Sequence, residues 1–564
     1  MVYNLLIGGA AGDGIETMAG VFEKILKRKG FYLFSMRDFM SRVRGGHNFA
    51  KIRFGAKPVR AHRDKLDGLV VFNEESFTLH QGELARNGFV LHDEDVQLRH
   101  KNAVPLAMKE LAKESGNAKT VGTVCAGAML QLFGLGIDMA EDVLKESLPP
   151  KILDANLKAL RLGYEAVAPR FSIKPGKKAE TMLLTGADAM ALGALAGGLQ
   201  FYSAYPMSPS TTLLEFFTKH SEDFRIGVEQ AEDEIAAVNM ALGAATAGAR
   251  AMTGTSGGGF SLMVEALGFA GIAEIPVVLA DIMRPGPSTG LPTRTEQSDL
   301  QFVIHASQGE FPRMVIALRD HEDAFYQTAR AFRLAWQYQI PVILLSDQYL
   351  ADSAATIPPL DGDKARQMAA LPAGTVETGK PSGEYKRYAL TKSGVSPLRF
   401  PGKSAALVRV DSDEHDERGT ITEAADVRTA QVDKRARKLK ALQKELQEPS
   451  YTGPKQPELL LVGFGTTAPA LAEAVKKLNK QPGTKAGALC FGDVWPLPTK
   501  TLKRLAKTAK HVVNVEQTAT GQLASLLRSQ ALVDCDTSIL KYDGRQLSVD
   551  DIVSGVQKLK LERV

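Results

Sequence analysis

The sequence predicts an α/β fold made of three α/β units. Short apolar runs of strand length alternate with helical patterns, and glycine-rich turns join the two kinds of element. A chain of 564 residues has room for about three or four domains of about 150 residues each. We predict an α/β domain over residues 1–172, a second over 179–355, an extended connector over 356–456 and a third α/β unit over 457–564.

In the first unit, a strand over residues 2–7 leads through a glycine loop, residues 8–14, into a helical pattern that ends near residue 28. Further strand-like runs lie at residues 31–34, 68–72 and 88–91. This alternation predicts a parallel sheet. The glycine loop resembles a phosphate-binding turn, but Thr17 occupies the third glycine position of the dinucleotide fingerprint. A tight strand–helix turn is therefore favoured, and a nucleotide-dependent dehydrogenase is an alternative function.

A basic segment follows in the same unit, where Arg42, Arg44 and His47 surround a pair of glycines. Such a loop is suited to a polyphosphate or a nucleotide tail, because cationic side chains and glycine N–H groups both bind anions. A solvated basic loop is the alternative interpretation.

The second unit contains a rigid loop, Tyr205-Pro206-Met207-Ser208-Pro209, at the end of an apolar, glycine-rich run. The two prolines fix φ at their own positions and restrict the residues before them, so the loop holds Ser208 in place. We expect the hydroxyls of Ser210 and Thr211 to cap the helix that follows. A loop of this kind suits a ligand, with a plain turn as the alternative.

An acidic group opens the helical stretch predicted over residues 229–249, which is almost entirely apolar downstream. Glu234 is the last of this group and is followed directly by apolar residues. It is therefore the carboxylate expected to reach the interior, while a simple helix N-terminal charge is the alternative.

Two arginines follow the strand predicted over residues 275–280, in a loop that contains Arg284 and Arg294. Loops at the carboxyl ends of strands form the ligand crevice of open α/β sheets, and arginine binds carboxylates or phosphates through paired N–H donors. Ser256, in a Gly/Ser-rich run, offers further donors. Solvated surface arginines are the alternative interpretation.

The connector is rich in proline, glycine and charge, and its residues 424–446 predict an exposed charged helix. We expect the connector to pack on its neighbours. The last unit begins with a strand over residues 459–462 and a glycine turn, which we interpret as a tight turn before a helix.

Composition excludes several classes of protein. The net charge of +5 is small for this length and does not indicate nucleic-acid binding. Cys125, Cys490 and Cys535 form no CxxC pair, so this chain alone cannot supply four thiolates to an iron–sulfur cluster, and we expect no metal site in it. Its start lacks the features of a signal peptide, and no apolar run is long enough to span a bilayer. We expect a cytoplasmic protein without membrane or nucleic-acid partners.

These motifs together resemble the alpha subunit of two-subunit 2-oxoacid:ferredoxin oxidoreductases, of the type with the gamma domain fused at the amino end. The most specific match is the segment at residues 205–211, which is similar to the family's Tyr-Pro-Ile-Thr-Pro-Ser-Ser. Supporting matches occur in the same order at residues 44–46, 186–188, 229–248, 290–297, 413–419 and 515–523. The resemblance implies a thiamine pyrimidine-binding domain over residues 179–355 and a transketolase C-terminal-like domain over residues 457–564.

The resemblance also implies roles for the candidate residues. Glu234 would hydrogen-bond the aminopyrimidine of thiamine diphosphate, Arg284 would bind the substrate carboxylate, and Ser208 stands where the family has a threonine beside cofactor and substrate. Further positions are implied for the cofactor (Tyr205, Pro206 and Ser256), for a second substrate carboxylate (Arg294) and for coenzyme A (Arg42, Arg44 and His47).

The implied reaction is the oxidative decarboxylation of a 2-oxoacid with coenzyme A to an acyl-CoA, CO₂ and reduced ferredoxin. The fused arrangement and Arg294 favour 2-oxoglutarate, which gives succinyl-CoA, with pyruvate or a branched-chain 2-oxoacid as alternatives. The implied partners are ferredoxin and a beta subunit that carries the diphosphate-binding domain, Mg²⁺ and a [4Fe–4S] cluster, in an (αβ)₂ heterotetramer. A non-catalytic subunit that only shapes its partner's site is the remaining alternative.

Overall fold

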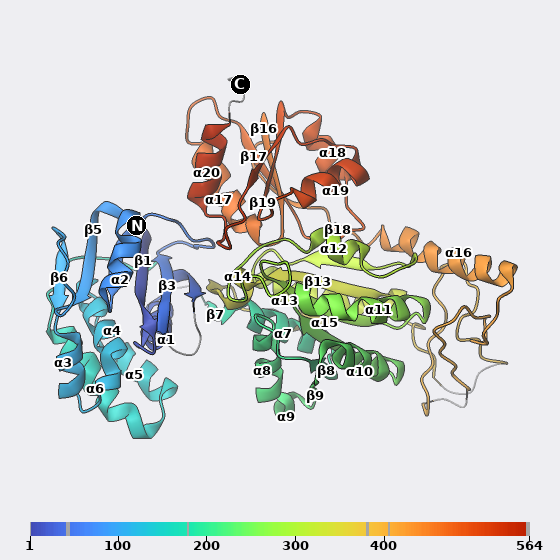
Figure 1. Cartoon of the computed structure of the whole chain (residues 1–564), viewed down its shortest axis with the longest axis horizontal. Helices are drawn as coiled ribbons and strands as arrows, with labels where there is room; N and C mark the ends of the chain where they lie inside the picture. Colours follow the sequence, from blue (N-terminus) through green and yellow to red (C-terminus); the bar gives the residue numbers. More distant parts are fainter. Residues whose placement is uncertain (1, 41–44, 177–179, 379–382, 404–405, 560–564) are drawn as a thin grey trace. The chain divides into compact units, whose positions relative to one another are not determined.

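The chain forms two compact units in a computed structural model that describes residues 2–40, 45–176, 180–378, 383–403 and 406–559 (Figure 1). The first unit combines three pieces of chain: Met1–Thr185, Asp352–Pro359 and Ser548–Asp551. The second unit contains the remaining residues. The α/β fold class predicted from the sequence is confirmed.

The first unit is built on an eight-stranded sheet with the order β6-β5-β4-β1-β3-β2-β14-β7. Its strands are β1 (Val2–Ala11), β2 (Tyr32–Phe39), β3 (Gly45–Gly55), β4 (Leu66–Val71), β5 (Leu84–Asp93), β6 (Ala103–Leu106), β7 (Met182–Thr185) and β14 (Ala354–Ile357). Strands β1, β4, β5 and β6 run parallel, whereas β1, β3, β2, β14 and β7 pair antiparallel. The predicted parallel sheet is confirmed for β1, β4, β5 and β6, whereas the antiparallel part was not predicted, because β3 was taken for part of a loop.

Helices cover both faces of this sheet. One face packs under α1 (Ile15–Arg28), α3 (Met108–Glu114), α4 (Val121–Leu132), α5 (Asp138–Ser147) and α6 (Pro150–Glu165). Helix α2 (Glu74–His80) lies on the other face, where Phe77 packs on a small apolar cluster. The predicted glycine loop begins later than expected, because β1 runs on through Gly8 and Gly9.

Two strands from outside the predicted first domain complete the sheet. β7 and β14 pair with each other, and β14 also pairs with β2. The hydroxyl of Thr356 accepts a hydrogen bond from the Leu33 N–H at 2.8 Å. The two ends of the predicted second domain thus belong to the sheet of the first unit.

The second unit contains a seven-stranded sheet with the order β18-β12-β13-β11-β10-β8-β9. Its strands are β8 (Phe201–Ala204), β9 (Gly227–Gln230), β10 (Ala251–Thr255), β11 (Val277–Met283), β12 (Met314–Ala317), β13 (Pro341–Asp347) and β18 (Asp493–Trp495). All neighbours run parallel except β12 and β18. The apolar α10 (Glu234–Thr246) and α11 (Gly257–Ile272) pack on one face, and α7 (Gly186–Ala196) packs on α13 (His321–Tyr338).

A five-stranded sheet with the order β15-β17-β16-β19-β20 forms the last part of the chain. Its strands are β15 (Ser450–Thr452), β16 (Leu459–Phe464), β17 (Ala486–Phe491), β19 (His511–Glu516) and β20 (Thr537–Leu540). Its side chains share one apolar core with α10, α11 and the seven-stranded sheet. The predicted turn at residues 463–467 leads into α17 (Ala468–Leu478).

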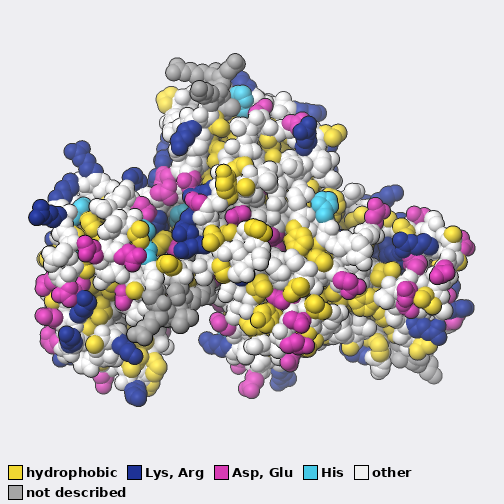
Figure 2. Space-filling model, viewed as in Figure 1, with side chains coloured by type: hydrophobic (Ala, Val, Ile, Leu, Met, Phe, Trp, Pro, Cys, Tyr) yellow, Lys and Arg dark blue, Asp and Glu magenta, His cyan; other side chains and the backbone are white. Residues whose placement is uncertain are grey.

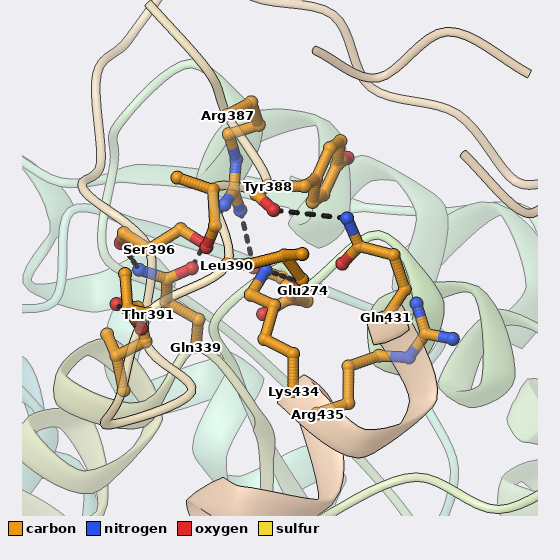
Figure 3. A network of polar contacts seen from close by, with 12 residues as sticks. Glu274, Gln339, Arg387, Tyr388, Leu390, Thr391, Ser396, Gln431, Lys434 and Arg435 are labelled. Atoms are coloured by element: carbon orange, nitrogen blue, oxygen red, sulfur yellow. Dashed lines mark hydrogen bonds and ion pairs between the residues drawn. The ribbon is translucent and has the colours of Figure 1, made fainter. Parts of the chain in front are cut away.

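The connector helix α16 (Ala425–Leu442) is not the exposed charged helix that the sequence predicted. It buries Lys434 and Lys438 completely, with 0% and 1% exposure. The Lys434 ammonium lies 2.5 Å from Glu274 Oε1 (Figure 3). Lys438 contacts the other carboxylate oxygen. Arg387 donates to the Glu274 carbonyl at 2.7 Å. The sequence predicted an exposed helix because the counterion of its two lysines is not close to them in sequence. That counterion, Glu274, lies far away along the chain.

Charged side chains of both signs are interspersed over the visible face of the molecule (Figure 2). Within the described parts of the chain, no helix is both long and apolar enough to cross a membrane. The same residues contain no group of three or more acidic, histidine or cysteine side chains that is arranged to hold a metal ion.

Candidate active site

Four loops meet at the carboxyl edge of the seven-stranded sheet. The strands β11, β10, β8 and β9 are neighbours and run parallel, so their following loops lie side by side. Arg284 follows β11, Ser256 follows β10, the loop with Ser208 follows β8, and Glu234 follows β9. This is where open α/β sheets bind ligands.

The loop after β8 is held by bonds within its own backbone. The Tyr205 carbonyl accepts from the Met207 N–H at 2.8 Å, and the Ser210 hydroxyl donates to the Met207 carbonyl at 2.7 Å. Ser210 therefore does not cap α8 (Thr211–Lys219) with its side chain, contrary to expectation. Ser208 is half-buried, and its carbonyl accepts from Arg284 Nη1 at 2.5 Å. The loops after β8 and β11 are thus joined directly.

Glu234 is the first residue of α10, where Asp233 caps the helix by accepting from the Ala236 N–H at 2.7 Å. The helix begins later than predicted, because Glu229 belongs to β9. As expected from its apolar neighbours, Glu234 is buried, with 3% exposure, and its Oε1 atom has no hydrogen-bond partner.

Gly259 on α11 makes room for this carboxylate. A Cβ atom at position 259 would lie 2.4 Å from Glu234 Oε1 and 2.1 Å from Thr255 Oγ1. Only glycine lets α11 come this close at position 259. Ser256 precedes α11 and is fully buried, and its hydroxyl has no partner.

Unpartnered buried atoms gather around this edge of the sheet. Native proteins satisfy almost all buried polar groups, so a cluster of exceptions indicates a missing polar ligand. The side chains concerned are Tyr202, Glu234, Thr253, Ser256, Asp281 and Arg284. They include acceptors, hydroxyls and one cation, and so fit a ligand that carries both donors and anionic groups.

The other predicted site residues of the second unit are less buried than Glu234 and Ser256. Tyr205 is exposed to 38%, and Pro206 is half-buried in the same loop. Arg294 packs against the loop after β20, where a Cβ on Gly544 would lie 3.2 Å from the Arg294 Cβ atom.

In the first unit, His47 lies on β3 and not in a loop, which corrects the prediction for this residue. It is buried, and its Nε2 atom lies 2.8 Å from His80 Nε2. His80 in turn contacts Glu83 at 2.6 Å. Burial raises the pKa of Glu83, but hydrogen bonds from His80 and Lys51 outweigh it and lower the pKa to about 2. Arg42 and Arg44 lie outside the described residues.

Comparison with known proteins gives matches along the whole chain. The family models of pyruvate ferredoxin/flavodoxin oxidoreductase, of its thiamine diphosphate-binding region and of pyruvate:ferredoxin oxidoreductase core domain II match residues 4–166, 192–434 and 457–552. The 2-oxoacid:ferredoxin oxidoreductase subunit alpha of Saccharolobus solfataricus is 30% identical over 98% of this chain and 97% of its own length. The chain belongs to this family of alpha subunits.

Two further relatives carry narrower names. The 2-oxoglutarate oxidoreductase subunit KorA of Mycobacterium tuberculosis is 31% identical over 86% of this chain and 77% of its own length. A solved 2-oxoglutarate:ferredoxin oxidoreductase from Magnetococcus marinus, with 2-oxoglutarate, coenzyme A and succinyl-CoA bound, covers 99% of both chains with a TM-score of 0.91 and 28% identity. The resemblance seen in the sequence is confirmed. The protein is a subunit of an oxidoreductase with the family's thiamine diphosphate-binding region.

Two carboxylates near Arg284 of this alpha subunit were missed by sequence reasoning. Asp281 lies on β11 with no exposure, and burial followed by the charge of Asp299 raises its pKa well above the usual value. Burial and the charge of Glu296 raise the pKa of Asp299 to about 7, although Arg284 opposes this. Only the position of Asp281 at a strand end could have pointed to it, and nothing in the sequence pointed to Asp299.

Proposed function

We propose that this alpha subunit contributes half of a site for the oxidative decarboxylation of 2-oxoglutarate to succinyl-CoA, with ferredoxin as electron acceptor. The observation that carries the proposal is the buried Glu234 carboxylate with an unpartnered oxygen, at the same sheet edge as the bonded pair Ser208 and Arg284. A buried acceptor without a partner costs free energy unless a ligand supplies the donor.

The residues present fit thiamine diphosphate at its pyrimidine end. Glu234 would hydrogen-bond a ring nitrogen, Gly259 keeps the space beside it open, and Ser256 offers a hydroxyl at the start of α11. Tyr205 and Pro206 would border the cofactor from the loop after β8. When bound, thiamine diphosphate supplies the electron sink for cleavage of a carbon–carbon bond next to a carbonyl. Through this hydrogen bond Glu234 would orient the ring and influence which of its nitrogens carries a proton.

Arg284 would bind the substrate carboxylate. One of its nitrogens is used by the Ser208 carbonyl, while its buried Nε atom has no partner. A guanidinium with unused donors in a buried setting is suited to a carboxylate. Fixing this group beside Ser208 would also orient the 2-oxo carbon toward the cofactor.

Three observations favour 2-oxoglutarate as the substrate. Relatives are named for it, the similar solved structure holds it, and Arg294 adds a second cation in the same loop for a second carboxylate. Pyruvate, after which the family models are named, is the second candidate. Coenzyme A as acyl acceptor rests on that solved structure and on the basic residues Arg42 and Arg44, with His47 held in its internal network.

The rest of the site would come from a beta subunit. The three cysteines of this chain are free and distant in sequence, so the [4Fe–4S] cluster, Mg²⁺ and the diphosphate-binding domain are assigned to that partner, in an (αβ)₂ assembly. The relatives' designation as subunit alpha supports a complex of several subunits.

The test is a Glu234→Gln variant in the assembled complex, assayed with 2-oxoglutarate and with pyruvate. We expect decarboxylation to fall at least about 100-fold, because a general acid–base group is lost, while assembly and thermal stability stay unchanged. The exposed Glu232→Gln is the matched control. Near-normal turnover by Glu234→Gln would sink the proposal, and a preference of the wild type for pyruvate would reverse the substrate assignment.

A further inference from the structure

The loop after β11 is closed at its neck by its own backbone. The Leu291 N–H donates to the Pro285 carbonyl at 3.0 Å, and the Arg294 N–H in turn donates to the Leu291 carbonyl at 3.1 Å. Arg284 stands directly before Pro285 in the sequence. The closure therefore brings the backbone that carries Arg294 back to the end of the loop where Arg284 begins it.

The chain that leaves this loop is fastened to the five-stranded sheet by Gln297, which is fully buried. The Gln297 N–H donates to the Gln517 carbonyl at 2.8 Å, and Gln297 Oε1 accepts from the Gln517 N–H at 3.2 Å. Gln297 Nε2 donates to the Phe464 carbonyl, at the end of β16, at 2.9 Å. The Gln517 side chain accepts from the Leu547 N–H at 2.5 Å and so holds the loop after β20 as well.

Gly544, in the loop after β20, is the residue on which Arg294 rests. A Cβ on Gly544 would lie 3.2 Å from Arg294 Cβ, 3.4 Å from Arg294 Cγ and 3.0 Å from Leu291 Cδ1. The Gly544 carbonyl also accepts from the Thr295 N–H at 3.4 Å, and its φ of 75° lies in the left-handed region. The aliphatic stem of Arg294 thus packs on backbone that a larger residue would push away.

We propose that Gly544 is a positioning residue for Arg294, and that the loops of the five-stranded sheet thereby set the preference for 2-oxoacids with a second carboxylate. This inference rests on the proposed function, in which Arg294 binds that carboxylate. A guanidinium binds a carboxylate through paired N–H donors of fixed geometry, so the contact depends on where the side-chain stem is held. Gly544 supports the stem, and Gln297 anchors the backbone that follows it.

Substrate chemistry distinguishes this role from a purely structural one. 2-Oxoglutarate and 2-oxopentanoate have carbon chains of equal length, but only 2-oxoglutarate ends in a second carboxylate. Both present the same 2-oxo group and first carboxylate to the proposed site. A displaced Arg294 weakens only the contact with the second carboxylate and lowers the ratio of kcat/KM for 2-oxoglutarate to kcat/KM for 2-oxopentanoate. A general loss of stability lowers both values by the same factor and leaves this ratio unchanged.

The experiment measures this ratio for the assembled complex. Gly544→Ala places a methyl group against the stem of Arg294, so the ratio should fall about tenfold, because small displacements weaken oriented contacts strongly. Gly483→Ala is the matched control. Gly483 has a similar φ of 80°, but no other described part of the chain lies within 4 Å of its added Cβ. Its ratio should stay at the wild-type value.

A double variant tests whether Gly544 acts through Arg294. Once Arg294→Met has removed the guanidinium, adding Gly544→Ala should change the ratio no further. Leu291→Ala keeps the inference testable where Gly544→Ala fails to assemble. The exposed Leu291 side chain also lies on Gly544, so shortening it loosens the packing around the stem and should lower the ratio about threefold.

The outcomes separate this inference from the proposed function. If Arg294→Met leaves the ratio unchanged, Arg294 does not bind the second carboxylate, and its proposed role fails together with this inference. If Arg294→Met lowers the ratio while Gly544→Ala and Leu291→Ala keep the wild-type value, the role of Gly544 is overturned and that of Arg294 stands. An equal fall in Gly544→Ala and Gly483→Ala, or a further fall in the double variant, also overturns the role of Gly544.

Discussion

The two ends of helix α11 carry buried polar clusters that differ in how their charges are compensated. At the amino end, Glu234, Ser256 and Asp281 are buried with unpartnered oxygens. Past the carboxyl end, each oxygen of the Glu274 carboxylate faces an ammonium group, one from Lys434 (Figure 3) and one from Lys438. Burial disfavours the charged forms of both the carboxylate and the lysines in the second cluster. The surrounding cations nevertheless hold the pKa of Glu274 well below its usual range.

The helix itself favours this arrangement. Its amino end carries partial positive charge, which suits carboxylates, and its carboxyl end carries partial negative charge, which suits cations. Arg387 adds to this by donating to the carbonyls of Ala273 at 3.4 Å and Glu274 at 2.7 Å, which helix termini leave without partners. The difference therefore lies in completeness. The carboxyl end is closed by the protein's own side chains, whereas the polar atoms at the amino end are left without partners among the described residues of the chain.

The largest effect is expected from removing the counterion of the two lysines past the carboxyl end of α11. Glu274→Gln leaves two fully buried lysines without their counterion, which should lower the free energy of unfolding by about 3–5 kcal/mol. Chemical denaturation of the complex measures this. The exposed Glu265→Gln on the same helix is the control. An equal effect of both variants would show that the cluster at Glu274 is not what holds α16.

An intermediate effect is expected from Gly259→Ala, at the amino end of α11. The added methyl group must displace Glu234 or Thr255, so activity should fall about 10-fold to 100-fold while the protein still folds. Gly258→Ala is the matched control, because the nearest atom to its Cβ is 3.7 Å away and alanine favours a helix. Steady-state rates of the two variants test this prediction. Equal activities would contradict the placement of Glu234 beside Gly259.

The smallest effect is expected from Asp281→Asn and concerns stability against pH. Since burial raises the pKa of Asp281, the folded protein keeps this proton at pH values where the unfolded chain has lost it. The contribution of this group to stability therefore falls as pH rises from about 4. Asp281→Asn should therefore lose less stability than wild type as the pH rises from 4 to 8. The exposed Asp433→Asn should follow the wild type, and parallel curves for all three proteins would refute the buried titration.

The same comparison shows which parts of the candidate site could be predicted from the sequence. The loop at residues 205–210, the burial of Glu234 and the position of Arg284 after a strand follow from local patterns: paired prolines, apolar neighbours and a buried run that ends at a polar loop. Their meeting at one edge follows from the parallel strand order, which the alternation of elements predicts. The roles assigned to these residues stay predictions.

Contacts between segments that are distant in sequence could not be predicted from such local patterns. Lys434 and Lys438 have the spacing of any solvated helix face, and only the fold reveals Glu274 beneath them. Asp299 looks like an ordinary loop residue until Gly257 is seen against it. Strand β3 was missed because its glycine-rich start follows arginines and resembles a loop.

The edge of the first sheet has a consequence for synthesis of the protein. β2 ends at Phe39, but its neighbour β14 does not begin until Ala354. At ribosomal rates of about 5–20 residues per second, one side of β2 waits ~15–60 s for its partner. A strand with free backbone groups pairs readily with other chains. The nascent protein therefore passes through a long interval in which this edge is open to mispairing, and a chaperone that covers it would act during that interval.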